Sequence, residues 1–427
     1  MLGIRRPINP AWVMLGVAFG SYFASSAVWG SFSVFMTALI DEFGWNRAAI
    51  ALSVAISTFS SGLSTPIFGY LADRFGPKRV MLGGTLALGL ALLGLSQASE
   101  LWHFYVLFGL VVGASNTALS GAPVSTLVVR WFQRRRGMAL GFTQAGFSVG
   151  QLLQIPLVTF IVVNQGWRWA FVALGIIILA WMPFVWFLGR DRPEEVGLRA
   201  DGEREDAARA VPAATRPPQE PDVSLSCAAR TAPFWLLVTT FGVCGFTVHM
   251  VMAHFATHAV DMGLSLSTAG TALSLMGGMN VAGTFLAGAI SDRIGRKNPL
   301  ALLYILRGLA ILLLMNAHDP WSLYLAAAVI GFSFRATGPL TSGLCGDLFG
   351  IRSVGVIFGL VLMTHQLAGG VSAYAAGWAF DVTGSYTPVF LVGVALLVVA
   401  GVLSFLIPEV SRKAAPTPAL GRADQGR

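Results

Sequence analysis

Twelve long stretches that are almost free of charged side chains set the strongest limit on how this chain can fold. Ten contain no Asp, Glu, Lys or Arg, and two contain a single arginine. Each has at least the ~20 residues that an α-helix needs to cross about 30 Å of hydrocarbon. Their continuous apolar character differs from the ~10-residue alternating segments of a membrane β-barrel. We predict an all-α polytopic membrane protein with helices in residues 7–40, 48–72, 80–99, 101–129, 137–167, 169–189, 231–260, 262–291, 298–318, 320–346, 353–380 and 382–408.

The composition excludes several classes of protein. Soluble domains are about 25% charged, whereas this chain is 11% charged and 55% hydrophobic. A chain this apolar could not cover its core with polar surface, which excludes a cytosolic enzyme and a secreted domain. The three cysteines, Cys227, Cys244 and Cys345, lack the spacing of a metal site or a disulfide framework. No phosphate-binding G-x-x-x-x-G-K-[ST] loop is found, so we expect no nucleotide, metal or other cofactor.

Lysine and arginine are distributed unequally between the predicted loops. If both termini are cytoplasmic, the short cytoplasmic loops and termini hold seventeen basic residues, against only Arg47 and Arg168 on the other side. This is a strong positive-inside bias. The net charge of +8 is then a topology signal rather than a sign of nucleic-acid binding. Three lysines against 25 arginines are typical of GC-rich bacterial genomes, so we expect a location in the cell inner membrane.

The chain divides into two halves that repeat. Residues 69–79 read GYLADRFGPKR and residues 288–298 read GAISDRIGRKN, at a constant offset of 219. Between the halves lies a segment rich in charge and proline, which cannot bury enough apolar area to fold. The predicted domains are the N-terminal six-helix half at 1–189, a disordered cytoplasmic linker at 190–230, the C-terminal half at 231–408 and a cytoplasmic tail at 409–427.

These motifs carry a resemblance to a known family. The pattern G-x-x-x-D-R-x-G-x-K in both halves is similar to the hallmark of the major facilitator superfamily. Residues 131–146, WFQRRRGMALGFTQAG, resemble the signature of its monocarboxylate porter branch, as do EFGWNRA at 42–48 and GWAFDVTGSY at 377–386. The resemblance implies a monomeric transporter whose first, fourth, seventh and tenth helices line a central cavity. The branch's acidic signature in the first helix is replaced here by Ala27, Val28, Trp29 and Gly30.

The repeated loop motif predicts a conformational gate. An aspartate at a helix end beside an arginine can pair across the loop and stabilise one state of the halves, and glycine allows the tight turn. The alternative is that these charges only fix the topology. The predicted gate residues are Gly69, Asp73, Arg74, Gly76, Lys78, Gly288, Asp292, Arg293, Gly295 and Lys297.

Two arginines stand inside predicted spans that contain no carboxylate in their interior. Arg335 lies near the middle of the tenth helix and Arg307 near the middle of the ninth. Placing an arginine at the bilayer centre costs at least ~2.5–3.5 kcal/mol, so such residues are functional by default. Because the tenth helix lines the cavity in the family's layout, Arg335 is the predicted binding residue for a substrate anion. Arg307 is predicted to be structural and to pair with backbone carbonyls or snorkel.

Other polar residues at membrane depth are weaker candidates. His249 and His365 are the predicted proton carriers, because histidine titrates near neutral pH. His254 and His258 approach the far rim. The alternative for each histidine, and for the other polar residues, is hydrogen bonding that only joins helices. The remaining candidate substrate residues are Gln366, Tyr22, Trp29, Asn116 and Gln144.

We therefore predict a secondary active transporter of a small organic anion, a mono- or dicarboxylate, taken up with protons by alternating access. Its partners would be that anion, a proton or counter-anion, and the lipid bilayer. One alternative is a drug or metabolite efflux antiporter, although the fifth helix lacks the G-P-x-x-G-G antiporter motif. An alternative of another class is a non-transporting membrane sensor with a transporter fold.

Overall fold

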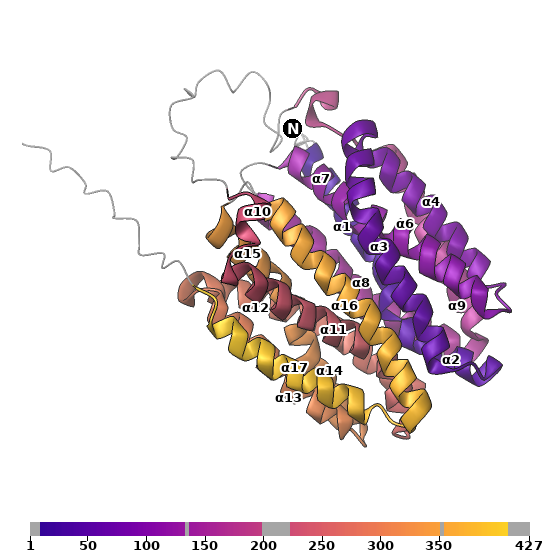
Figure 1. The fold of residues 1–427 in the computed structure, drawn as a ribbon. Helices are drawn as coiled ribbons and strands as arrows, with labels where there is room; N and C mark the ends of the chain where they lie inside the picture. The colour runs from indigo at the N-terminus through magenta and orange to yellow at the C-terminus, as the bar shows by residue number, and fades with distance from the viewer. Residues whose placement is uncertain (1–8, 133–135, 199–222, 351–353, 409–427) are drawn as a thin grey trace, which may run out of the picture.

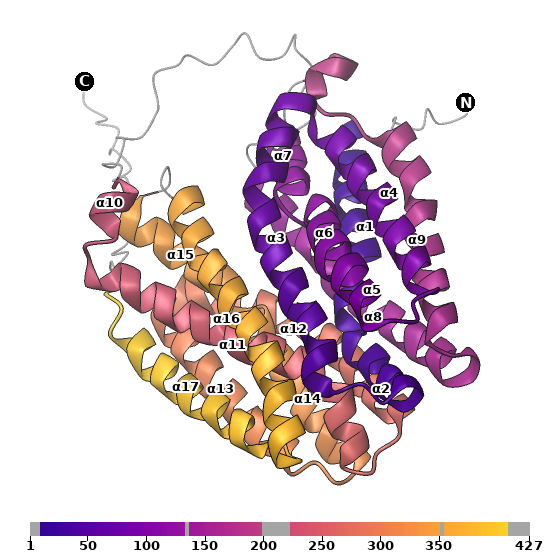
Figure 2. The same cartoon turned by 45° about the vertical axis from the view of Figure 1, so that its right-hand side comes forward.

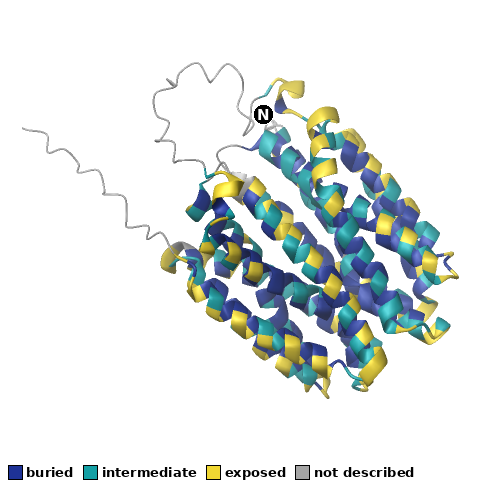
Figure 3. Ribbon diagram, viewed as in Figure 1, coloured by how far each residue is buried: buried dark blue, intermediate teal, exposed yellow. Residues whose placement is uncertain are grey.

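The computed structural model describes residues 9–132, 136–198, 223–350 and 354–408 as helices and loops, with no β-strand among them (Figure 1). Twelve helical spans in this part of the chain are long and apolar enough to cross a membrane, which confirms the predicted fold class. Large apolar side chains such as Leu63, Phe187 and Trp321 are exposed on the outer surface. Exposed residues run along the outward faces of the helices (Figure 3). Lipid rather than water suits such a surface.

The N-terminal half contains six spans, of which the first and fourth are interrupted. A turn at Ser31 separates α1 from α2, and the turn at Gly121 separates α6 from α7. The elements are α1 (Pro10–Gly30), α2 (Phe32–Phe43), α3 (Arg47–Phe75), α4 (Pro77–Leu95), α5 (Leu101–His103), the π-helix η1 (Phe104–Val112), α6 (Gly113–Ser120), α7 (Ala122–Trp131), α8 (Arg136–Gln165) and α9 (Trp167–Leu188).

The C-terminal half also contains six spans. The fourth of these, which is the tenth span of the protein, is interrupted between α14 and α15. Its elements are α11 (Ala232–Asp261), α12 (Leu266–Ile294), α13 (Lys297–Met315), α14 (Pro320–Phe334), α15 (Thr337–Phe349), α16 (Val354–Thr383) and α17 (Thr387–Phe405). Asp319 caps α14, and hydrogen bonds from the Ser322 hydroxyl and backbone N–H lower the pKa of its carboxyl. Helix α12 begins and ends 219 residues after α3, so the internal repeat extends to helix boundaries.

The two halves meet along three helix pairs, α3 with α16, α8 with α12, and α2 with α11. We call the end of the bundle with the loops that follow α3 and α12 the basic end, because Arg74, Arg79, Arg293 and Arg296 lie there. The halves touch at the opposite end and diverge toward the basic end (Figure 2). An even number of spans places Pro10 and Phe405 at the basic end together.

The segment between the halves is partly ordered, so the prediction of disorder over residues 190–230 was wrong at both of its ends. Residues 193–196 form the 3₁₀ helix η2 (Pro193–Val196) and residues 225–228 form α10 (Leu225–Ala228). The Asp191 carboxylate accepts a hydrogen bond of 2.7 Å from the Lys78 backbone N–H, at the first turn of α4. A polar contact with the bundle therefore holds the first end, and burial of Ala228 in the core holds the second. Residues 199–222 and the tail from 409 lie outside the described residues.

Candidate functional site

Arg335 lies at the break in the tenth span, halfway between Pro320 and Phe349. Pro339 accounts for the break, because its ring nitrogen cannot donate to the Arg335 carbonyl and its ring would clash there. The Gly338 N–H donates to that carbonyl instead, at 3.2 Å. The break leaves the Arg335 side chain half-buried near the middle of the membrane span.

The Arg335 guanidinium faces the N-terminal half across the centre of the protein. Its Cζ atom lies 3.8 Å from the centroid of the Phe147 ring of α8, which is a cation–π contact. It has no hydrogen bond or ion pair with any described side chain. Tyr22 of α1 is close enough to interact with it electrostatically. A fixed positive charge with open donors at this depth has the chemistry of an anion site.

Two predicted histidines lie together, one on α11 and one on α16. The ring centroids of His249 and His365 are 5.5 Å apart, and Trp29 of α1 meets His249 edge-on at 6.1 Å. His365 is within electrostatic range of both Arg307 and Arg335. The Nδ1 of His365 pairs with Oε1 of Gln366 at 3.1 Å, and the Nδ1 of His249 donates to the Gly245 carbonyl at 3.0 Å. Both residues are half-buried, and Nε2 of each ring has no hydrogen-bond partner among the described residues.

Two further predicted residues are placed less directly. Gln144 is exposed on α8 one turn from Phe147, and the spacing of three puts both on one helix face. Asn116 of α6 stands 219 residues before Arg335, so it is the repeat equivalent of that arginine. Its Oδ1 is buried without a hydrogen-bond partner among the described residues. The repeat places Asn116 in the fourth span at the depth that Arg335 has in the tenth. Among the described residues, the two side chains make no hydrogen bond with each other.

Arg307 has the surroundings that were expected of a structural residue. Its side chain is 1% exposed, in contrast to the half-buried Arg335. It donates to the backbone carbonyls of Ser333 and Phe334, the second at 3.1 Å, and to the sulfur of Cys244 at 3.1 Å. These bonds satisfy the guanidinium inside one half, where they tie α13 to α14 and α11.

The predicted gate residues lie at the basic end, in the last two turns of α3 and α12, in the loop turns that follow, and at the starts of α4 and α13. Gly76 and Gly295 have φ values of 90° and 87°, which a glycine adopts without strain. The Asp73 carboxylate lies 3.5 Å from Arg130 of α7, and Arg74 donates to the Tyr70 hydroxyl at 3.0 Å. In the other half, Arg296 pairs with Asp347 of α15. The side chain of Asp292 lies outside the described residues.

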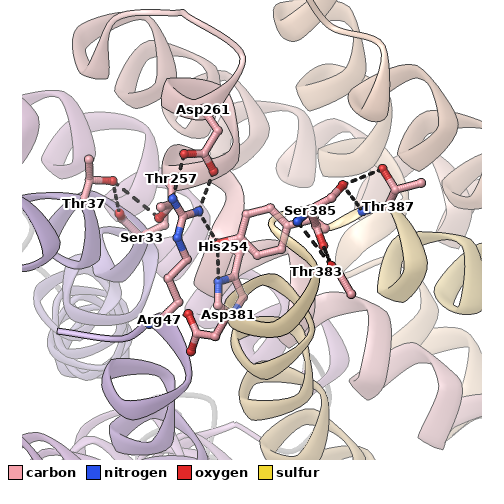
Figure 4. A network of polar contacts seen from close by, with 11 residues as sticks. Ser33, Thr37, Arg47, His254, Thr257, Asp261, Asp381, Thr383, Ser385 and Thr387 are labelled. Carbon is pink, nitrogen blue, oxygen red and sulfur yellow. Dashed lines mark hydrogen bonds and ion pairs between the residues drawn. The ribbon is translucent and has the colours of Figure 1, made fainter. Parts of the chain in front are cut away.

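A group of residues at the opposite end was missed by the sequence reasoning. The guanidinium of Arg47 donates to both oxygens of Asp261, at 2.5 and 2.7 Å (Figure 4). It also donates to the Tyr386 hydroxyl at 2.7 Å. Its Cζ lies 3.6 Å over the Phe380 ring. The carboxylate of Asp381 accepts the backbone N–H groups of Arg47 and Ala48. We call Arg47, Asp261, Asp381 and Tyr386 the Arg47 clamp, since it joins the start of α3 to the C-terminal half.

His254 extends this clamp into the protein. Its Nε2 donates to the Ala373 carbonyl at 2.8 Å, so in the neutral ring Nδ1 accepts from the Tyr386 hydroxyl at 3.0 Å. His258 pairs with the Leu314 carbonyl at 3.3 Å. One sequence signal could have identified the clamp: Arg47 is one of only two basic residues expected on that side of the membrane.

The fold and this centre define a class of protein. Two six-span repeats surround an arginine, two histidines and aromatic side chains at mid-membrane, as in transporters that bind substrate between their halves. The sequence model described as Major Facilitator Superfamily matches residues 18–315 and 250–424. The chain therefore belongs to the Major Facilitator Superfamily, and it is a membrane transporter rather than an enzyme.

Curated relatives are similar over nearly the whole chain. An uncharacterised MFS-type transporter, YcxA, of Bacillus subtilis is 24% identical over 96% of this chain and 98% of its own length. Monocarboxylate transporter 13 of Rattus norvegicus is 27% identical over 94% of this chain and 91% of its own length. Monocarboxylate transporter 12 of Mus musculus is 25% identical, over 95% and 88%. The chain is thus similar to the monocarboxylate transporters, as its motifs indicated.

Proposed function

We propose that this protein is a secondary active transporter of a small organic anion, a mono- or dicarboxylate, and that it takes up the anion with protons by alternating access. The observation that carries the proposal is the unpaired Arg335 guanidinium at the centre of the membrane. An arginine at this depth needs a counter-ion, and its planar fork matches a carboxylate with two hydrogen bonds. The names of the relatives support the same substrate class.

The proposed cycle uses the two ends of the bundle alternately. In the structure the Arg47 clamp joins the halves at one end while they diverge at the basic end. We propose that the basic end and both termini face the cytoplasm of an inner-membrane protein, as the positive-inside bias indicates. This conformation would then release substrate to the cytoplasm. Opening of the clamp would expose Arg335 to the other side.

The test is uptake of labelled carboxylates into vesicles that contain the purified protein, with and without a pH gradient. Saturable carboxylate uptake that increases with an inward proton gradient is the expected result. Accumulation of a cationic drug against the opposite gradient would favour the efflux antiporter. A sensor without transport activity would bind a ligand and move nothing across the membrane.

The histidine pair should carry the proton dependence. We expect His249→Gln or His365→Gln to flatten the dependence of carboxylate uptake on external pH, because glutamine can hydrogen bond but cannot titrate. Exchange of carboxylate across the membrane without net proton movement should survive. The control is His318→Gln, which changes an exposed histidine outside the centre. If both centre variants keep the wild-type pH profile, histidine has no part in coupling.

The loop gate should affect rate rather than affinity. Asp73→Asn removes the contact with Arg130 at the basic end, far from Arg335. Because the Asp73 carboxylate is largely exposed, the pair is worth at most about 1 kcal/mol, and transport should slow roughly twofold to fivefold. Equilibrium binding, measured by thermal shift, should stay close to wild type. Loss of binding with fast exchange retained would contradict the gate assignment.

A further inference from the structure

The backbone N–H of Arg335 is held by a side chain from another helix. At the break between α14 and α15 this N–H has no main-chain acceptor, and it donates instead to Oδ1 of Asn280 of α12, at 3.0 Å. Main-chain N–H groups at a helix break must find a partner when buried. Asn280 therefore fixes the backbone from which the Arg335 side chain projects.

The packing around Asn280 leaves it little freedom. Helices α12 and α14 approach so closely that a Cβ on Gly283 would lie 1.8 Å from the Phe332 carbonyl oxygen, and one on Gly331 would lie 2.3 Å from that of Met276. Residues 276, 280 and 283 share one face of α12 by their spacing of four and three. The Asn280 side chain is 1% exposed and lies on this face. It cannot turn away from the helix break.

An amide at this position leaves a buried donor unpaired, and the contact with the Arg335 backbone does not require that donor. Nδ2 of Asn280 is buried and has no hydrogen-bond partner among the described residues. An aspartate would accept the same N–H more strongly, since charged acceptors form stronger bonds, and would bring no unpaired donor. An aspartate, however, would also place a negative charge at the Arg335 backbone, one side-chain length from its guanidinium. The neutral side chain keeps that guanidinium without a partner inside the protein.

We propose that Asn280 is a positioning and specificity-determining residue for the Arg335 anion site: its carbonyl oxygen holds the helix break, and its neutrality reserves Arg335 for the substrate carboxylate. The inference rests on the proposed function. It assigns to α12 a role at the binding site without direct contact with the substrate. It also explains why the buried amide nitrogen remains unpaired.

Two substitutions separate this role from a purely structural one. Asn280→Asp keeps the acceptor for the Arg335 N–H and adds a charge, whereas Asn280→Ala removes the acceptor and adds none. We expect Asn280→Asp to raise the KM for carboxylate roughly 30-fold or more with the protein still folded, because the introduced carboxylate competes for the guanidinium. Asn280→Ala should raise KM less and should lower the melting temperature more. If Asn280 were purely structural, Asn280→Ala would raise KM more than Asn280→Asp does.

The probe is uptake of labelled pyruvate and benzoate into vesicles, with the ratio of variant to wild-type KM measured at each pH. In Asn280→Asp this ratio should fall toward one as the pH falls, because a protonated carboxyl is neutral like the amide. A wild type that takes up neither carboxylate overturns both this inference and the proposed function. Two results would overturn the inference alone, provided that the wild type takes up pyruvate or benzoate. One is an Asn280→Asp variant with the wild-type KM, and the other is a ratio of variant to wild-type KM that does not change with pH.

Discussion

Arg335→Ala should abolish nearly all affinity for a carboxylate substrate while leaving a folded protein in the membrane. The guanidinium makes no hydrogen bond to any described residue, so its removal leaves no internal partner unsatisfied. Loss of one member of a desolvated charge pair costs about 2–5 kcal/mol, which corresponds to a loss in affinity of roughly 30-fold to several thousandfold. Substrate-dependent thermal stabilisation and the KM for uptake both measure this loss.

Arg335→Lys tests whether the fork geometry matters as well as the charge. Lysine keeps the positive charge but cannot form two parallel hydrogen bonds with a carboxylate, and it stacks less well on a ring such as Phe147. We expect an affinity between those of wild type and Arg335→Ala. If the wild type and the lysine variant bind a carboxylate with equal affinity, the site recognises only the charge of the substrate.

Arg307→Lys is the matched control, because Arg307 is the other arginine inside a span. Its guanidinium donates to the carbonyls of Ser333 and Phe334 within one half, and lysine cannot reproduce all of these bonds. Each unmade buried hydrogen bond costs about 1–3 kcal/mol, so the variant should lose thermal stability and expression level. Its KM should change less than that of Arg335→Lys. The anion assignment fails if a well-expressed Arg335→Ala protein transports a carboxylate with wild-type affinity.

Most of the fold could be predicted because membrane insertion is a local property of the sequence. A run of about 20 apolar residues must form a helix to satisfy its backbone in lipid, whatever its neighbours are. The twelve predicted stretches and the twelve spans found among the described residues agree for this reason. Interruptions within spans were not predicted, although Gly121 and Pro339 stand at or near two of them. A proline in a transmembrane helix is tolerated often enough that it does not by itself locate a break.

The candidate site could be predicted only where a residue type is unusual for its place. Arg335 stood out because arginine is rare at mid-membrane. Phe147 did not stand out, because a phenylalanine in a transmembrane helix is ordinary, and its contact with Arg335 joins opposite halves. The Arg47 clamp was missed for a related reason: Asp381 and Arg47 are 334 positions apart. Pairings over such distances depend on how the halves are arranged, which a single sequence does not specify.

Arg47→Ala should open the end of the bundle that the structure shows closed. The clamp combines a bidentate ion pair with Asp261, a hydrogen bond to Tyr386 and a cation–π contact with Phe380, all between the two halves. These bonds exist only while the halves touch at this end, so they stabilise one conformation over the other. Loss of about 2–5 kcal/mol from a partly buried pair shifts such an equilibrium by at least tenfold.

A reporter thiol can detect this shift. Met252→Cys, introduced with Cys227→Ser, places a thiol beside Trp29 and His249, behind the clamp. We expect Arg47→Ala to increase its labelling rate by a reagent that cannot cross the bilayer and that is added on the clamp side, roughly tenfold or more. Arg168→Ala is the matched control, because Arg168 lies at the same end but pairs with Glu42, inside one half. Its removal deletes an ion pair of the same kind without touching the contact between halves. Equal labelling of wild type and Arg47→Ala, or equal increases in both arginine variants, would show that the clamp does not hold this end closed.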